Sequence, residues 1–221
     1  MVSRTLDRGL RIRRPDLGED LPAGPATFDD EFELYGRRVD HADVEMADAV
    51  GTMSKVIVDG TSLAGSRFGK LELEDSRFES TDLSNAAWPE VIARRVEFLR
   101  CRGVGWRCDF GMAGDVYLQG CRLDYAMIDV KRVRGLLVLD DCSLREASLS
   151  GDLSKVVFTG CDLTGADFQP TNADGCDLRG STLDRARGLL NLRGAKIDPQ
   201  QLMAVAAQLA TSAGLVIVGD D

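Results

Sequence analysis

Large apolar residues recur at every fifth position through most of this chain. Between Gly151 and Arg185 the sequence divides into seven blocks of five, and the middle residue is large and apolar in six of them. These blocks are GDLSK, VVFTG, CDLTG, ADFQP, TNADG, CDLRG and STLDR. The first residue of each block is small or β-branched, the second is mostly Asp or Asn, and the last is often Gly. The five side chains of each block are therefore predicted to point inward, outward, inward, outward and outward.

A period of five fits neither the 3.6 residues of a helix turn nor the strict alternation of a long strand. It does fit a very short extended segment that places two side chains inward and ends in a bend. Gly tolerates positive φ at such a bend, and Asp or Asn can hydrogen-bond the local backbone. Four segments of this kind would close a square coil of twenty residues.

A longer period in the sequence agrees with such a coil. The pairs Phe98/Cys101, Leu118/Cys121, Leu139/Cys142 and Phe158/Cys161 follow one another at steps of 20, 21 and 19 residues. These steps predict that equivalent residues of successive coils stack in ladders on one side of the molecule. With a one-residue insertion before Leu139 and a one-residue deletion before Leu153, the frame extends from Leu34 to Ile197.

The blocks CDLTG, ADFQP, CDLRG and TDLSN resemble the motif of the pentapeptide-repeat proteins, which is a small residue, Asp or Asn, Leu or Phe, and two variable positions. The resemblance covers about three quarters of the chain. It implies an all-β fold, a right-handed quadrilateral β-helix of about eight coils. At the ~4.8 Å spacing of adjacent strands, this would be a rod about 40 Å long.

Three regions follow from this frame. Residues 1–33 are rich in Pro, Gly and charge and are expected to form a flexible N-terminal arm or cap. Residues 34–197 form the β-helix. Residues 198–221 are expected to form a C-terminal capping α-helix and a short strand over Leu215 to Val218, because Asp198 and Pro199 are typical of a helix start.

The predicted C-terminal helix has one apolar face. That face consists of Leu202, Val205, Ala206 and Leu209, which have helical spacing. It would cover the open strand edge of the last coil. In the family that the repeats resemble, a C-terminal helix can also mediate a head-to-head homodimer, so capping and dimerisation are both expected uses of this face.

The six cysteines are interpreted mainly as packing residues. Five of them fall at the small inward position: Cys101, Cys121, Cys142, Cys161 and Cys176. Cysteine packs there as a small apolar residue. Cys108 falls outside that position and is the one cysteine whose reactivity calls for a test. No closely spaced pair of cysteines typical of a zinc site occurs, so we predict no metal and no cofactor.

The stretch from Cys101 to Asp115 departs from the repeat. Gly103, Cys108 and Ala113 stand where Leu or Phe is expected, and Trp106 stands where a small residue is expected. The sequence predicts a distorted coil or a bulged loop here. It is interpreted either as a local packing defect or as a partner-binding feature, with an exposed Trp106 beside Arg107 as hot-spot residues.

Catalytic chemistry finds no support in the sequence. The chain has one His and no phosphate-binding loop or nucleophilic triad, so we predict that it is not an enzyme. No window approaches the roughly 18 apolar residues of a membrane span, and residues 1–15 contain five Arg without the apolar stretch of a secretory signal. We therefore expect a cytoplasmic protein without a membrane contact.

Charge bears on the choice of partner. Some members of the family that the blocks resemble imitate duplex DNA, bind type II topoisomerases such as DNA gyrase or topoisomerase IV, and confer quinolone resistance. A ~40 Å rod would have to imitate roughly 23 phosphates. The whole chain has a formal net charge of -9, but residues 34–197 contain 25 acidic and 22 basic side chains, a net charge of only -3.

The acidic residues concentrate toward the C-terminal end of the repeat. Between positions 140 and 184 nine acidic residues stand against three basic ones, a local net charge of -6. The acidic residues are Asp140, Asp141, Glu146, Asp152, Asp162, Asp167, Asp174, Asp177 and Asp184. They are the candidate partner-binding face of a DNA mimic that inhibits or protects a topoisomerase, with Asp162, Asp167 and Asp177 expected to point outward.

The alternative is a general protein-interaction scaffold of unknown partner. Direct nucleic-acid binding would require a basic stripe, and the sequence offers only Arg94, Arg95, Arg100, Arg102 and Arg107 for one. We therefore expect a protein partner and no direct contact with nucleic acid.

Overall fold

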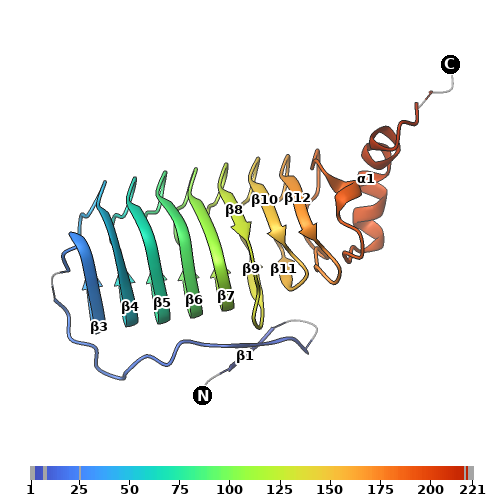
Figure 1. Cartoon of the computed structure of the whole chain (residues 1–221). Coiled ribbons are helices and arrows are strands. Elements are labelled where there is room, and N and C mark those ends of the chain that lie inside the picture. Colours follow the sequence, from blue (N-terminus) through green and yellow to red (C-terminus); the bar gives the residue numbers. More distant parts are fainter. Residues whose placement is uncertain (1–2, 7–8, 25, 217, 219–221) are drawn as a thin grey trace.

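The computed structural model of the chain describes residues 3–6, 9–24, 26–216 and 218. Most of them build a parallel β-solenoid of about seven turns that forms a straight rod, with one helix at its C-terminal end (Figure 1). The all-β solenoid and the terminal helix are confirmed. The eighth expected coil is not complete, because residues near its end form a short 3-10 helix, η2 (Leu189–Asn191), in place of a strand.

Long strands form the first half of the rod. Each of them wraps around three sides of a coil and pairs in parallel with the equivalent strand of the next coil. They are β3 (Asp30–Asp40), β4 (Asp48–Asp59), β5 (Arg67–Glu79), β6 (Ala87–Leu99) and β7 (Arg107–Gln119).

Shorter strands continue the second half. After β7 the path divides, so that β8, β10 and β12 follow one side of the rod while β9 and β11 follow another. Their bounds are β8 (Met127–Val130), β9 (Leu137–Asp140), β10 (Ser148–Asp152), β11 (Val156–Thr159) and β12 (Asp167–Asn172).

The predicted ladder is present in the strand register. Phe98 pairs with Leu118, Leu118 with Leu139, and Leu139 with Phe158. The inserted residue before Leu139 is accommodated by a turn at Gly135, whose φ of 102 favours glycine. The two inward residues of each repeat therefore fill one continuous core, which extends from Phe28 to the capping helix.

Four outward ladders run along the rod, and we name the four faces by them. Face 1 carries Asp43, Ser62, Asp82, Arg102, Arg122, Ser143, Asp162 and Thr182. Face 2 carries Asp48, Arg67, Ala87, Arg107, Met127, Ser148, Asp167 and Arg187. Face 3 begins with Thr52, Glu72, Ile92 and Met112. Face 4 carries Arg38, Ile57, Arg77, Glu97, Tyr117, Val138, Val157 and Asp177.

Both ends of the solenoid are covered. At the N-terminal end, the Phe28 ring stacks on Phe68, with ring centroids 5.7 Å apart. At the C-terminal end, helix α1 (Pro199–Ser212) begins at Asp198 with the expected cap, whose side chain accepts a hydrogen bond from the Gln201 N–H. Among the described residues of the expected C-terminal strand, Leu215, Val216 and Val218 belong to no strand, since no neighbouring strand pairs with them.

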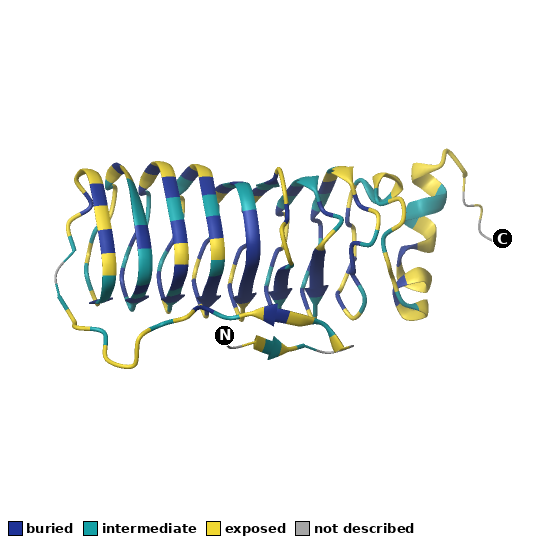
Figure 2. Cartoon of the chain, turned by 60° about the horizontal axis from the view of Figure 1, so that its bottom comes forward, coloured by how far each residue is buried: buried dark blue, intermediate teal, exposed yellow. Residues whose placement is uncertain are grey.

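The N-terminal segment lies along the rod. Strands β1 (Ser3–Thr5) and β2 (Arg11–Arg13) pair antiparallel and lie beside face 4 (Figure 2). The Asp16 N–H donates to the Asp75 carboxylate at 2.9 Å. The expectation of a flexible arm is therefore corrected for these described residues: apolar side chains and ion pairs hold them against the solenoid.

Candidate functional site

The nine candidate carboxylates do not share a face. Glu146, Asp162 and Asp184 lie on face 1 and its turns, Asp167 on face 2, Asp152 and Asp174 on face 3, and Asp140, Asp141 and Asp177 on face 4 and its turns. Successive repeats place their second residue on successive sides of the coil. A run of acidic blocks along the sequence therefore spreads its charge around the rod.

Several of these carboxylates also have partners within the rod. Asp162 lies 3.6 Å from the Arg145 guanidinium, and Glu146 lies 3.4 Å from that of Arg187. The Tyr117 hydroxyl donates to Asp140 at 2.5 Å. Burial, with this hydrogen bond, raises the pKa of Tyr117, so the tyrosine remains a donor to the carboxylate.

Asp177 does not point into solvent as the sequence predicts. Only 4% of it is exposed, and its carboxylate contacts Arg179 two residues later at 2.5 Å. The second residue of a repeat is half-shielded by the coils on either side, and the arginine at the turn covers the rest. Asp177 is therefore a structural ion pair, whereas Asp162 and Asp167 do lie at the surface.

Trp106 is buried as well, so the expectation of an exposed hot-spot tryptophan is wrong. Its exposed fraction is 0%, and its ring lies edge-on to Trp88 with centroids 5.3 Å apart. Gly103 is the reason: a Cβ at Gly103 would lie 3.4 Å from the Trp106 Cβ. The glycine at the central position leaves the volume that the tryptophan at the small position fills. Strand β7 is continuous through this stretch, but its register with β6 shifts between the pairs Trp88/Cys108 and Ile92/Met112, so a local irregularity is present.

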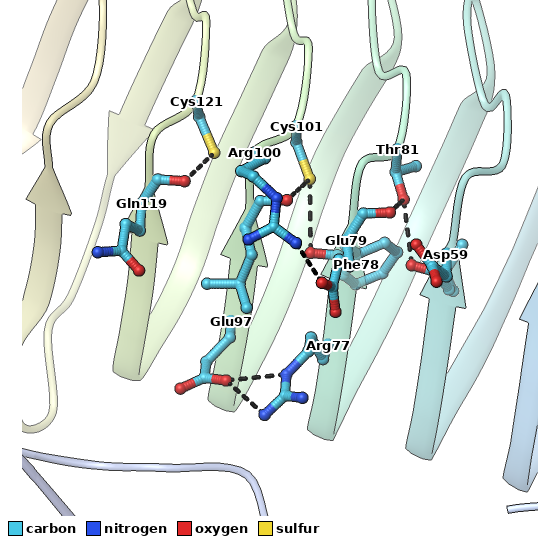
Figure 3. A network of polar contacts seen from close by, with 12 residues as sticks. Asp59, Arg77, Phe78, Glu79, Thr81, Glu97, Arg100, Cys101, Gln119 and Cys121 are labelled. Atoms are coloured by element: carbon cyan, nitrogen blue, oxygen red, sulfur yellow. Dashed lines mark hydrogen bonds and ion pairs between the residues drawn. The ribbon is translucent and has the colours of Figure 1, made fainter.

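Four of the buried cysteines, Cys101, Cys121, Cys142 and Cys161, form a ladder, of which Cys101 and Cys121 are drawn in Figure 3. The Cys101 thiol donates to the Phe78 carbonyl oxygen at an Sγ···O distance of 3.5 Å, and the Cys121 thiol donates to that of Phe98 at 3.4 Å. Thr81 occupies the equivalent position one coil earlier, and its hydroxyl donates to the Val58 carbonyl at 3.2 Å. The ladder position therefore selects small side chains that can donate to the preceding coil.

Cys108 belongs to the core rather than to a reactive site. It is fully buried, and burial raises the pKa of its thiol, with the charge of Asp109 adding to the effect. The thiolate is the reactive form of cysteine. The structure therefore gives no basis for the reactivity that its sequence position suggested.

The arginines that offered a basic stripe are mostly neutralised. Arg95 bonds both Glu74 and Asp75, Arg100 pairs with Glu79 (Figure 3), and Arg102 lies 3.9 Å from Asp82. Hydrogen bonding to Asp75 is the main cause that raises the pKa of Arg95. Charges of both signs alternate along the rod and leave no basic stripe among these residues.

One region combines exposed apolar side chains with arginines that have no ion pair among the described residues. It lies where face 1 turns into face 2, and we call it the corner surface. It consists of Met46, Gly65, Arg67, Asn85, Ala87, Gly105, Arg107, Tyr125 and Met127. A groove of about 310 Å³ runs along its first part. Met46, Tyr125 and Met127 are 72%, 63% and 52% exposed.

Glycines shape this groove. Gly65 and Gly105 have φ of 66 and 69 at the turn, and they alternate along the ladder with side chains from the coils between them. A Cβ on Gly65 would meet the Met46 sulfur, and one on Gly105 would meet the Asn85 amide. The sequence did not predict the corner surface, because its residues come from five successive coils. The signal for it was the presence of Met, Tyr and Arg at outward positions.

Comparison with known families identifies the repeats in the second half of the rod. A family model described as pentapeptide repeats matches residues 138–183 in eight copies. The strand register carries the same five-residue frame through the rest of the solenoid. Residues 138–183 are thus similar to the pentapeptide-repeat family. No curated protein matches this chain.

Two solved structures are similar to this chain in chain path. Trypsin-treated QnrB1, a plasmid-mediated fluoroquinolone resistance protein, is 21% identical with a TM-score of 0.47, and the match covers 87% of this chain and 100% of that one. HetL, involved in heterocyst differentiation regulation in the cyanobacterium Nostoc sp. strain PCC 7120, is 16% identical with a TM-score of 0.38, covering 74% and 86%.

The capping helix has two apolar sides. Val205 is buried and Leu209 packs on the core, as expected for a cap. Leu202 is 49% exposed and Ala206 is exposed as well, so the predicted four-residue face does not pack as a unit. The helix is rotated so that Gln201, one residue earlier, lies inward with Val205.

In residues 3–6, 9–24, 26–216 and 218, no three His, Cys, Asp or Glu side chains gather as ligands of an ion would. No helix in the same ranges combines the length and apolarity needed to cross a membrane.

Proposed function

We propose that this chain is a non-catalytic protein-binding rod of the pentapeptide-repeat family that engages its partner through the corner surface. The observation that carries the proposal is the gathering of exposed Met46, Tyr125 and Met127 around Arg67 and Arg107. Tyr, Met and Arg are enriched in protein interfaces, and Tyr and Arg, with Trp, are enriched among interface hot spots. Elsewhere the outward arginines are largely engaged within the rod.

The spacing of the two arginines suggests the partner's chemistry. Arg67 and Arg107 are two coils apart on face 2, which is about 10 Å at the spacing of adjacent strands. Ala87 between them leaves room for a side chain of the partner. An extended segment with two carboxylates on either side of an apolar residue would complement this arrangement.

A cross-linking experiment with charge reversal tests the proposal. A photo-reactive amino acid replaces Tyr125 in the full-length chain, and cross-linked partners are recovered from the source cells. We expect Arg67→Glu with Arg107→Glu to reduce the cross-linked product at least tenfold. Arg94→Glu with Arg134→Glu is the matched control, because these arginines are also exposed and two coils apart, on a different face. Equal losses in both double variants would contradict the proposal.

The topoisomerase hypothesis makes a different prediction. A DNA mimic needs a continuous negative face, and the nine carboxylates are divided over four faces, with several of them paired. We therefore expect no inhibition in a DNA gyrase supercoiling assay at micromolar protein, and no protection from a fluoroquinolone. Salt-sensitive inhibition that is abolished by reversing Asp162 and Asp167 would restore the mimic hypothesis.

A further inference from the structure

Face 4 carries an apolar patch where the repeat normally places a polar residue. On three successive coils the outward ladder position is occupied by Tyr117, Val138 and Val157, at the place where other blocks have Asp or Asn. With Leu99 they form an apolar cluster separate from the solenoid core. An outward patch of this kind on a rod marks a contact surface.

The N-terminal segment covers this patch in the structure. We call residues 3–6 and 9–16 the strap. Ile12 is only 1% exposed against the patch, and Leu6 and Leu10 pack beside it. The Arg4 guanidinium lies 4.1 Å from the centre of the Tyr117 ring, which adds a cation–π contact.

Carboxylates at the border of the patch form ion pairs with the arginines of the strap. Glu97, 2% exposed, accepts from Arg14 at 3.0 Å and from Arg77 of the solenoid at 3.0 Å. Asp115, 4% exposed, accepts from Arg13 at 2.5 Å. The site thus recognises an extended segment with an aliphatic residue followed by two arginines.

The strap is held in a way that permits exchange. In the described residues its two strands pair with each other and not with the solenoid sheet. A cleft of about 280 Å³ remains between the strap and face 4, lined among others by Leu6, Tyr117 and Asp140. Removing the strap would break side-chain contacts but no ladder of the β-helix.

We infer that the face 4 patch is a docking site for an extended basic and aliphatic segment of a partner protein, and that the strap occupies this site in the absence of the partner. The inference does not depend on the corner surface, which lies on other faces. A tethered strap competes with an effective concentration in the millimolar range. The partner must therefore displace it or bind after it is released.

A peptide in trans tests this inference. The probe is a fluorescent synthetic peptide with the sequence of residues 3–16, and its binding is followed by anisotropy. In the full-length chain, Ile12→Asp with Arg14→Glu releases the strap by placing negative charge against the apolar patch and Glu97. We expect the peptide to bind this strap-released variant at least tenfold more tightly than the wild type.

Two controls define the site. Adding Val138→Asp to the strap-released variant should abolish peptide binding, whereas adding Met112→Asp, also at an apolar outward ladder position but on face 3, should leave it unchanged. Continued protection of the buried thiols shows that the solenoid is intact. If the thiols become reactive, Ile12→Ala replaces the double substitution.

Two results would overturn the inference. The peptide could fail to bind the strap-released protein although its solenoid is folded, in which case the patch serves only its own tethered segment. Alternatively, it could bind wild type and variant equally, in which case the strap does not compete for the site. Neither result affects the corner surface, which is tested by Arg67 and Arg107.

Discussion

At the scale of single residues, the narrow interior of the coil dictates which side chains exchange for one another. Gly103 and Trp106 invert the usual large and small positions, and the core remains filled because the two changes compensate. Cysteine, threonine and serine replace one another in the inward ladder because each is small and can donate to a carbonyl of the preceding coil. A repeat can therefore depart from the motif at one inward position when the other inward position compensates for the change in volume.

Trp106 provides a direct test of this compensation. Trp106→Ala should lower the free energy of unfolding by about 3–5 kcal/mol, since a buried aromatic side chain is lost beside a glycine that cannot fill the cavity. Urea unfolding followed by circular dichroism measures the change. Trp106→Phe should cost less, because the indole N–H has no hydrogen-bond partner in the described structure. An alanine variant as stable as the wild type would contradict the packing argument.

The buried thiols predict a loss of stability at alkaline pH. Burial raises the pKa of Cys176 to about 12, and hydrogen bonding with Cys101, together with burial, raises the pKa of Cys121 to about 12. Thiols of the unfolded chain titrate near 8.5. The folded chain thus retains protons that the unfolded chain releases, so this contribution is fully present below about pH 8.5 and falls as pH rises toward 12.

The measurement is a series of urea unfolding curves from pH 7 to 10.5. The urea concentration at the midpoint of unfolding should decrease as the pH rises above 8.5. Cys176→Ala should make this decrease less steep. A thiol reagent at pH 8 should label none of the six cysteines until the protein is unfolded, since all six are buried. Rapid labelling of Cys108 in the native protein would show that the coil around it opens.

At the scale of elements, the capping helix depends on one glutamine. The Gln201 amide donates to the carbonyl oxygens of Leu178 and Ser181, each at 2.6 Å. It thus provides a hydrogen-bond donor for two backbone carbonyls at the end of the solenoid. Its side-chain oxygen also accepts from the Asp198 N–H at 2.8 Å, which completes the capping box. One residue thus starts the helix and fastens it to the solenoid.

Gln201→Ala should therefore loosen the cap. Two buried carbonyls would lose their partner, at a cost of about 1–3 kcal/mol for each group left unsatisfied. Hydrogen exchange should increase over α1 and the last coil, with little change in the first coils, because each coil of a solenoid contacts only its neighbours. Gln208→Ala is the matched control in the same helix. Uniform destabilisation along the rod would contradict this local role.

At the scale of the whole molecule, charge is balanced along the sides and apolar surface remains exposed at the C-terminal end. Leu202, Met203, Leu215 and Val216 are 49%, 79%, 64% and 86% exposed. Ion pairs between neighbouring coils, such as that of Arg95 with Asp75, neutralise the charges on the sides of the rod. No side therefore has an electrostatic field of a single sign along its whole length. Contacts of the rod with other molecules should therefore concentrate at its end, its corner surface and face 4.

A second copy of the chain is the expected occupant of the exposed end. We predict a symmetric dimer through the outward side of α1, with Leu202 and Met203 at its centre. Leu202→Glu with Met203→Glu should convert the dimer to a monomer in light scattering after gel filtration, without a change in the melting temperature of the solenoid. A wild-type protein that is monomeric at high micromolar concentration would refute this prediction.

The sequence by itself determined the solenoid, its ladder steps and the start of the helix at Asp198, because these depend on periodic packing and on local backbone chemistry. It did not determine where an outward residue lies relative to the other coils. Asp177 was expected at the surface, and one of the two interpretations of Trp106 exposed it. Both are buried, since coils twenty residues away shield them. Only the tertiary structure brought the strap to face 4 and the corner residues together, because these contacts join segments that no local pattern relates.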